Sequence, residues 1–136
     1  MSLVLCERIA KKIEIAGLGE ISKTIFVESM PAEIKRGILV KMSLAGSKID
    51  HELPGLYRPK IQIIVRAQSH ADGENLATAI LNLLQSKQDT IWNDASNNPL
   101  FLMKQFLPYT MPIIYPRSDG NGLEVSVNFD LCYVVL

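Results

Sequence analysis

The sequence predicts an α+β fold, with two helices packed on one face of a mainly antiparallel, four- to five-stranded sheet. Residues 61–67 and 123–135 alternate apolar and polar side chains, which is the period of a strand with one buried face. Residues 3–16 and about 69–86 repeat apolar side chains at helical spacing, and each repeat forms a single stripe. Two such helices bury their stripes against the apolar face of a sheet and leave its other face polar.

The first third of the chain is expected to form one helix and two short strands. The helix over residues 3–16 ends at Gly17 and Gly19, since glycine readily adopts the conformation of a helix C-terminus. Residues 24–28 are rich in β-branched and aromatic side chains, and residues 37–43 place their apolar side chains on one face, so we expect a strand in each.

The middle of the chain combines a long connection with the clearest internal strand. Residues 44–58 show no sustained period, and connections of this length inside a compact domain are usually functional or mobile. Residues 59–68 form the strand. Ser69 is placed to cap the helix that follows, which runs to about residue 86. Residues 87–99 are predicted as a polar connection.

The last third of the chain is expected to end in its best strand. Residues 100–107 are predicted as a strand although neither of its faces is cleanly apolar. Three prolines within 108–116 confine any strand there to an edge or to short pieces. Two glycine-containing turn signals within 119–122 precede the long alternation of 123–135.

Composition favours a globular protein that associates with others. The 136 residues have the length of one domain, which we expect to span residues 1–136. Lys+Arg and Asp+Glu both number 14, and the zero net charge argues against a general nucleic-acid binder and favours association. Residues 1–68 hold 11 basic and 7 acidic side chains (+4), and residues 69–136 hold 3 and 7 (−4). This asymmetry suits a molecule with different surfaces for different neighbours.

The cysteines and the apolar runs exclude several classes of protein. Cys6 and Cys132 lie among apolar residues without zinc-like spacing, so we expect two buried, reduced thiols in a cytosolic environment. No basic leader precedes a long apolar run at the N-terminus, and no stretch approaches the apolar length of a membrane span. We therefore expect neither secretion nor contact with a membrane.

No pattern of residues points to catalysis or to a bound cofactor. His51 is flanked by Asp50 and Glu52, but a metal site would need further ligands, and the spacing of the two histidines matches no metal motif. His70 is expected at the surface in the first turn of a helix. Trp92 is expected to clamp onto the helix or sheet rather than to form a stacking platform, because no basic or aromatic residues are interleaved around it. We expect a non-enzyme without metal or cofactor.

Two stretches carry a resemblance to a known family. The first is the loop and strand LPGLYRP-KIQIIVRA over residues 53–67, and the second is the turn and strand PRSDGNG-LEVSVNFD over residues 116–130. Together with the order of the elements, they make the chain similar to the tail terminator family of long-tailed bacteriophages, also labelled minor capsid or minor tail proteins.

The resemblance implies a structural protein of the virion. A member of this family forms a hexameric ring on the head-proximal end of the tail tube. The ring stops tail polymerisation and provides the surface that joins the head. The implied partners are further copies of the chain, the major tail tube protein and the head–tail connector protein, with no sequence-specific nucleic acid, and assembly takes place in the bacterial cytoplasm. Alternatives are another head–tail joining or tail-tube structural protein and, in a different class, a small accessory hydrolase.

A partner interface is expected from the loop at 44–58, the turn near 117–119 and the C-terminal strand. The loop combines charges with large apolar side chains, and its prolines stiffen it. Tyr57 and Arg58 are the expected hot spots by residue type. The alternative is that Leu53, Leu56 and Tyr57 fold back onto the sheet as a lid. The full set of candidate interface residues is Lys48, Asp50, Glu52, Tyr57, Arg58, Arg117, Asp119 and Val134.

Overall fold

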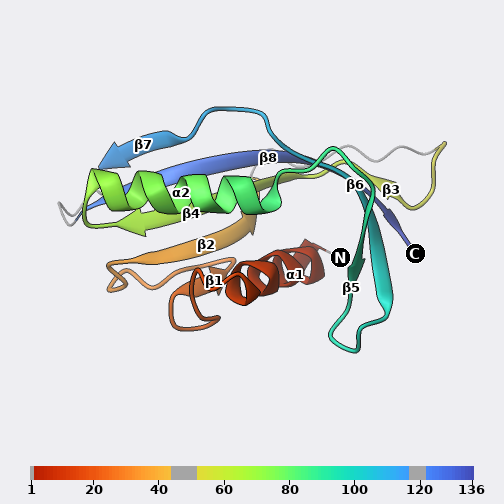
Figure 1. Ribbon diagram of the computed structural model, residues 1–136, viewed down its shortest axis with the longest axis horizontal. Helices are drawn as coiled ribbons and strands as arrows, with labels where there is room; N and C mark the ends of the chain where they lie inside the picture. Colours follow the sequence, from red (N-terminus) through yellow and green to blue (C-terminus); the bar gives the residue numbers. More distant parts are fainter. Residues whose placement is uncertain (1, 44–51, 117–121) are drawn as a thin grey trace.

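A computed structural model describes residues 2–43, 52–116 and 122–136 (Figure 1). Within them lie two helices and eight strands. The helices are α1 (Ser2–Ile15) and α2 (His70–Leu84). The strands are β1 (Ile25–Val27), β2 (Gly37–Met42), β3 (Leu56–Tyr57), β4 (Lys60–Ala67), β5 (Thr90–Asn93), β6 (Pro99–Pro108), β7 (Ile113–Pro116) and β8 (Leu123–Val135).

Strand β8 is a central strand of a single sheet and pairs with more strands than any other described strand. The order along the sheet is β1-β2-β4-β8-β6-β5, and β3 and β7 also pair with β8. One edge of β8 pairs with β4 and then β3, and the other edge pairs with β7 and then β6. All pairs are antiparallel except β1 with β2, which is parallel. The 13 residues of β8 therefore organise four other strands.

The predicted fold class is wrong. The protein is mostly β, with eight strands in a strongly curled, mixed half-barrel instead of a four- to five-stranded antiparallel sheet under two helices. Strands β3, β5 and β7 have two to four residues, which is too short for an alternating pattern to reveal them. Strands in a sheet are ordinarily twisted. A β-bulge, such as the one in β6, increases this twist locally and so adds to the curl of the sheet.

The bulge in β6 explains why neither face of residues 100–107 looked apolar in the sequence. The pairing of β6 with β8 shifts register between Met103 and Gln105. Phe101 and Met103 are buried before the bulge, and Phe106 is buried after it. One extra residue thus moves the buried positions from odd to even numbers. The predicted polar connection over 87–99 is also wrong in part, because it contains β5, which forms a hairpin with β6.

The two helices close the concave side of the sheet. Helix α2 lies along β4 and β8, and α1 lies beside β1 and β2 (Figure 1). Ser69 caps α2 as predicted, accepting a hydrogen bond from the Asp72 amide at 3.2 Å. Buried residues of both helices and of the sheet form one cluster; its largest side chains include Phe101, Phe106, Phe129, Leu5, Ile9, Ile13, Ile61, Ile63 and Ile80.

The side of β4 and β8 that faces away from the hydrophobic cluster carries a row of polar pairs. Lys60 lies opposite Asp130, with Nζ 2.7 Å from Oδ1, and Arg66 lies opposite Glu124. Between them, the Gln62 amide donates to Ser126 Oγ at 2.9 Å. The alternation predicted for these strands is confirmed, and opposite charges directly across a strand pair fix the register of the two.

Candidate partner interface

Tyr57 and Tyr133 meet at one end of the sheet. Strand β3 pairs with the end of β8, so that Tyr57 lies opposite Tyr133 and Leu56 opposite Val134. The Tyr57 and Tyr133 rings are 5.6 Å apart, and Tyr133 also packs on Phe101 at 4.7 Å. Burial raises the pKa of Tyr133, with the neighbouring Tyr57 adding to the effect. Tyr57 is thereby held by aromatic packing while part of its surface stays open.

Four of the eight predicted interface residues can be placed. Glu52 and Arg58 are exposed, and Tyr57 and Val134 are half-buried. The pairing of β3 with β8 brings Tyr57, Arg58 and Val134 to the same end of the sheet. The other four residues lie in 44–51 and 117–121, outside the described residues: Lys48, Asp50, Arg117 and Asp119. His51 and the predicted turn at 119–121 lie there too.

The described part of the loop supports each of the two alternatives in part: a lid that folds back onto the sheet, and a contact with a partner. Tyr57 packs against the hydrophobic cluster, as a residue folded back onto the sheet would. Leu53 and Arg58 remain exposed, as contact residues would. The segment is therefore anchored through Tyr57 and leaves a charged and an apolar side chain in solvent on either side of it.

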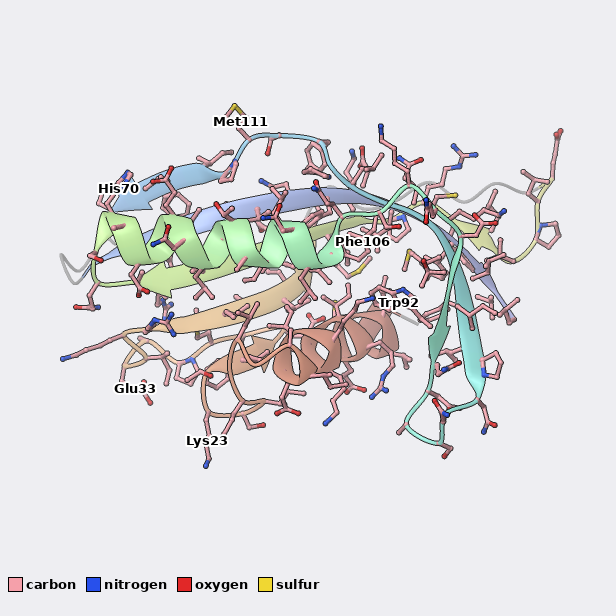
Figure 2. All side chains as sticks on the ribbon, viewed as in Figure 1. Lys23, Glu33, His70, Trp92, Phe106 and Met111 are labelled. Atoms are coloured by element: carbon pink, nitrogen blue, oxygen red, sulfur yellow. The ribbon has the colours of Figure 1, made fainter. Side chains whose placement is uncertain are left out.

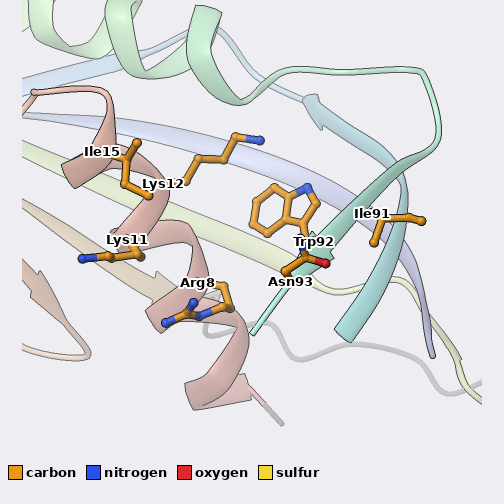
Figure 3. A pocket seen from close by; sticks show the side chains of 7 residues that line it. All are labelled: Arg8, Lys11, Lys12, Ile15, Ile91, Trp92 and Asn93. Carbon is orange, nitrogen blue, oxygen red and sulfur yellow. The ribbon is translucent and has the colours of Figure 1, made fainter. Parts of the chain in front are cut away.

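A groove between α1 and β5 was not predicted from the sequence (Figure 3). It has a volume of about 230 Å³ and is lined by Arg8, Lys11, Lys12, Ile15, Ile91, Trp92 and Asn93. A signal was present in the helix, where three cations follow one another at i, i+3 and i+4 and therefore share a face. The other wall comes from a strand that the sequence did not reveal.

Trp92 forms the floor of this groove, and Lys12 lies over it. The Lys12 Nζ is 4.6 Å from the centre of the Trp92 ring, and on its other side Trp92 stacks on Phe106 at 5.9 Å. Burial lowers the pKa of Lys12. Trp92 is 8% exposed, and Figure 2 places it beside Phe106 at the end of the core. Trp92 thus packs onto both α1 and the sheet, in agreement with the prediction that it clamps onto the helix or the sheet.

The reactive groups of the described residues are dispersed. Within residues 2–43, 52–116 and 122–136, no three metal-ligating side chains come together. Burial raises the pKa of the Cys6 thiol to about 12, with Glu28 and Glu7 adding to the effect, so this thiol stays protonated. Cys132 is only half-buried, which corrects the expectation of two buried thiols. His70 lies at the surface in the first turn of α2, as predicted.

Exposed apolar side chains on the outer strands, such as Ile91 on β5 and Ile113 and Ile114 on β7, are typical of a surface that contacts other proteins. The sequence matches the profile of the bacteriophage tail terminator protein over residues 12–135. The chain therefore belongs to the bacteriophage tail terminator family, as its motifs predicted, and is a structural component of a phage-type tail.

The fold is shared with a protein of a phage-like particle. The structure is similar to a chain from the "Virion of native gene transfer agent (GTA) particle", with a TM-score of 0.62 and 11% sequence identity over 96% of this chain and 95% of that chain. A comparison with curated proteins found no match. None of the described helices is long and apolar enough to cross a membrane.

Proposed function

We propose that six copies of this chain form a ring on the head-proximal end of the tail tube. The ring stops tube polymerisation and offers the surface that joins the head. The observation that carries the proposal is the family match over residues 12–135.

Residues 1–136 are, in this proposal, one subunit and one domain. Its partners are the neighbouring copies, the tail tube protein and the head–tail connector, and the complex assembles in the bacterial cytoplasm without a cofactor or a catalytic step. The candidate contact with a partner is the end of the sheet where Tyr57, Arg58 and Val134 lie together. An aromatic residue and an arginine at one site are the residue types that dominate protein interfaces.

The test is electron microscopy of tails assembled with and without the protein. Tails of defined length that join heads in its presence, and overlong, headless tails in its absence, are expected. A matched pair of variants addresses the contact: Arg58→Glu should give overlong or headless tails, and Lys23→Glu, at an exposed residue on another part of the surface, should not. A protein that stays monomeric with tail tubes would exclude the ring.

A second candidate is another head–tail joining or tail-tube structural protein. The likeness to a chain of the gene transfer agent virion supports this candidate as well, because that likeness concerns the fold and not a particular place in the particle. Such a protein would be found along the tube or at the connector in gold-labelled particles, whereas a terminator is confined to one end of the tube.

A further inference from the structure

We propose that the groove between α1 and β5 is a docking site for an extended segment of a partner protein that carries carboxylates beside aliphatic side chains. The groove is formed by residues from two elements that are far apart in the sequence, and neither element forms it alone (Figure 3). This contact is separate from the ring interface and does not depend on the ring.

The helix wall of the groove supplies positive charge. Lys11 forms an ion pair with Glu14 at 2.8 Å, so part of its charge is already satisfied. Arg8 and Lys12 make no ion pair among the residues that the structure describes, and both are half-buried. An arginine and a lysine held side by side on one helix face bind carboxylates well, because the guanidinium donates to both carboxylate oxygens at once.

Apolar side chains flank these cations on both walls. Ile15 on α1 is 76% exposed and Ile91 on β5 is 55% exposed, and both line the groove. Two large aliphatic side chains in solvent on opposite sides of one groove mark an apolar contact surface. A ligand that covers them must itself be apolar at those points.

The geometry of β5 favours a protein segment over a nucleic acid. Among the described strands β5 pairs only with β6, so its second edge has no strand partner and can accept an extended segment. A nucleic-acid backbone would neutralise the cations but would leave Ile15 and Ile91 in solvent. A peptide with alternating acidic and aliphatic side chains satisfies the cations, the isoleucines and the strand edge together.

Trp92 makes the groove directly observable, because it is the single tryptophan of the chain. The probe is a capped peptide of alternating Glu and Val, added to the full chain while Trp92 fluorescence is recorded. We expect a saturable change that weakens with added salt. A peptide of alternating Lys and Val, one of alternating Glu and Gly, and an oligo-dT should each bind at least about tenfold more weakly.

Variants test whether the probe occupies this groove. Arg8→Glu should weaken binding of the Glu–Val peptide at least about tenfold, and Lys35→Glu, an exposed cation of the segment before β2, should leave it unchanged. Ile91→Asn tests the apolar wall at an exposed position and should also weaken binding. Circular dichroism of each variant separates a lost contact from a lost fold.

Several results would overturn the proposal. One is the absence of a saturable change with the Glu–Val peptide; another is equal binding by Arg8→Glu. Tighter binding of oligo-dT would make the groove a nucleic-acid site. A fluorescence change on concentrating the protein alone, lost in Arg8→Glu, would make a second copy the occupant. Ring formation is tested separately, by the length of assembled tails. A failure of the proposed function and a failure of this groove contact therefore give different results.

Discussion

Arg66 on β4 and Glu124 on β8 face each other across the sheet, with Arg66 Nε donating to Glu124 Oε2 at 2.9 Å. The side chains are only 13% and 18% exposed. Arg66 Nη1 also donates to the carbonyl oxygens of Pro31 at 2.7 Å and Ile34 at 3.3 Å. One guanidinium therefore joins the centre of the sheet to the segment that precedes β2.

The Arg66→Met variant should lower the free energy of unfolding by about 2–3 kcal/mol, because it leaves a largely buried carboxylate without its partner. Urea unfolding followed by circular dichroism measures this. Lys60→Met is the matched control on the same strand and face, where both partners are more exposed. Its loss should be clearly smaller, and equal losses would contradict the importance assigned to burial.

Substitution of Gly122 and of Gly55 by alanine distinguishes two effects of an added side chain, backbone strain and a steric clash. Both have a positive φ, +87° and +84°, but a Cβ at Gly122 would meet the Ala67 carbonyl oxygen, while a Cβ at Gly55 meets nothing within 4 Å. Gly55→Ala should lower the free energy of unfolding by about 1 kcal/mol through backbone strain alone. Gly122→Ala should lower it by about 3 kcal/mol, since backbone must also move. Equal thermal unfolding midpoints would refute this difference.

Long, strongly patterned elements were predictable from the sequence. The limits of β8 agree with the predicted strand 123–135, because its alternation persists over many residues and both neighbouring strands support the same buried face. Helix α2 was predictable because a local hydrogen bond to Ser69 fixes its start. Where local chemistry and packing agree, the sequence alone defines the element.

The curl of the sheet and the groove were not predictable. Strands β5 and β7 owe their existence to pairing with β6 and β8, and their few residues carry no period of their own. The bulge near Lys104 reverses the buried face of β6. The strand over residues 100–107 was therefore predicted correctly although the sequence showed no single apolar face. The groove depends on α1 and β5 meeting in space, which no local pattern encodes.

The two cysteines should react with thiol reagents at very different rates. Cys6 is buried with its pKa raised to about 12, so native protein at mildly alkaline pH keeps it protonated and inaccessible. Cys132 is half-buried on β8 and should be modified first. Ellman's reagent should titrate one thiol quickly in native Cys6→Ala and none quickly in Cys132→Ala. Rapid modification of Cys132→Ala would contradict the packing of α1 on the sheet.

Phe106 should be a critical residue of the core beneath the groove. It is fully buried between Trp92, which it stacks on at 5.9 Å, and Phe129, whose ring it meets edge-on at 4.9 Å. Phe106→Leu should lower the free energy of unfolding by about 1–3 kcal/mol through the cavity it leaves. The emission of Trp92 should shift to longer wavelength as its packing loosens. Met111→Leu, at a position that is 84% exposed, is the control and should leave both readings nearly unchanged.

The Arg36–Asp72 pair should make stability depend on pH in acid. Arg36 Nε donates to Asp72 Oδ2 at 2.8 Å and Nη2 donates to Oδ1 at 3.2 Å, which joins the segment before β2 to the first turn of α2. The hydrogen bonds from Arg36 lower the pKa of Asp72. A carboxyl group with a lowered pKa in the folded state stabilises the protein above its unfolded pKa. That contribution is lost as pH falls through the folded pKa.

Asp72→Asn should therefore lower the free energy of unfolding by about 0.5–1 kcal/mol at neutral pH, a modest value because both side chains are partly exposed. The difference from the parent protein should shrink to nothing as the pH falls below the ordinary range of an aspartate carboxyl. Chemical unfolding at a series of pH values measures both. Asp89→Asn, an exposed carboxylate 3.6 Å from Lys104 Nζ, is the control and should show a smaller difference throughout. A gap between Asp72→Asn and the parent that persisted at the lowest pH would mean that Asp72 stabilises the fold by some means other than its charge.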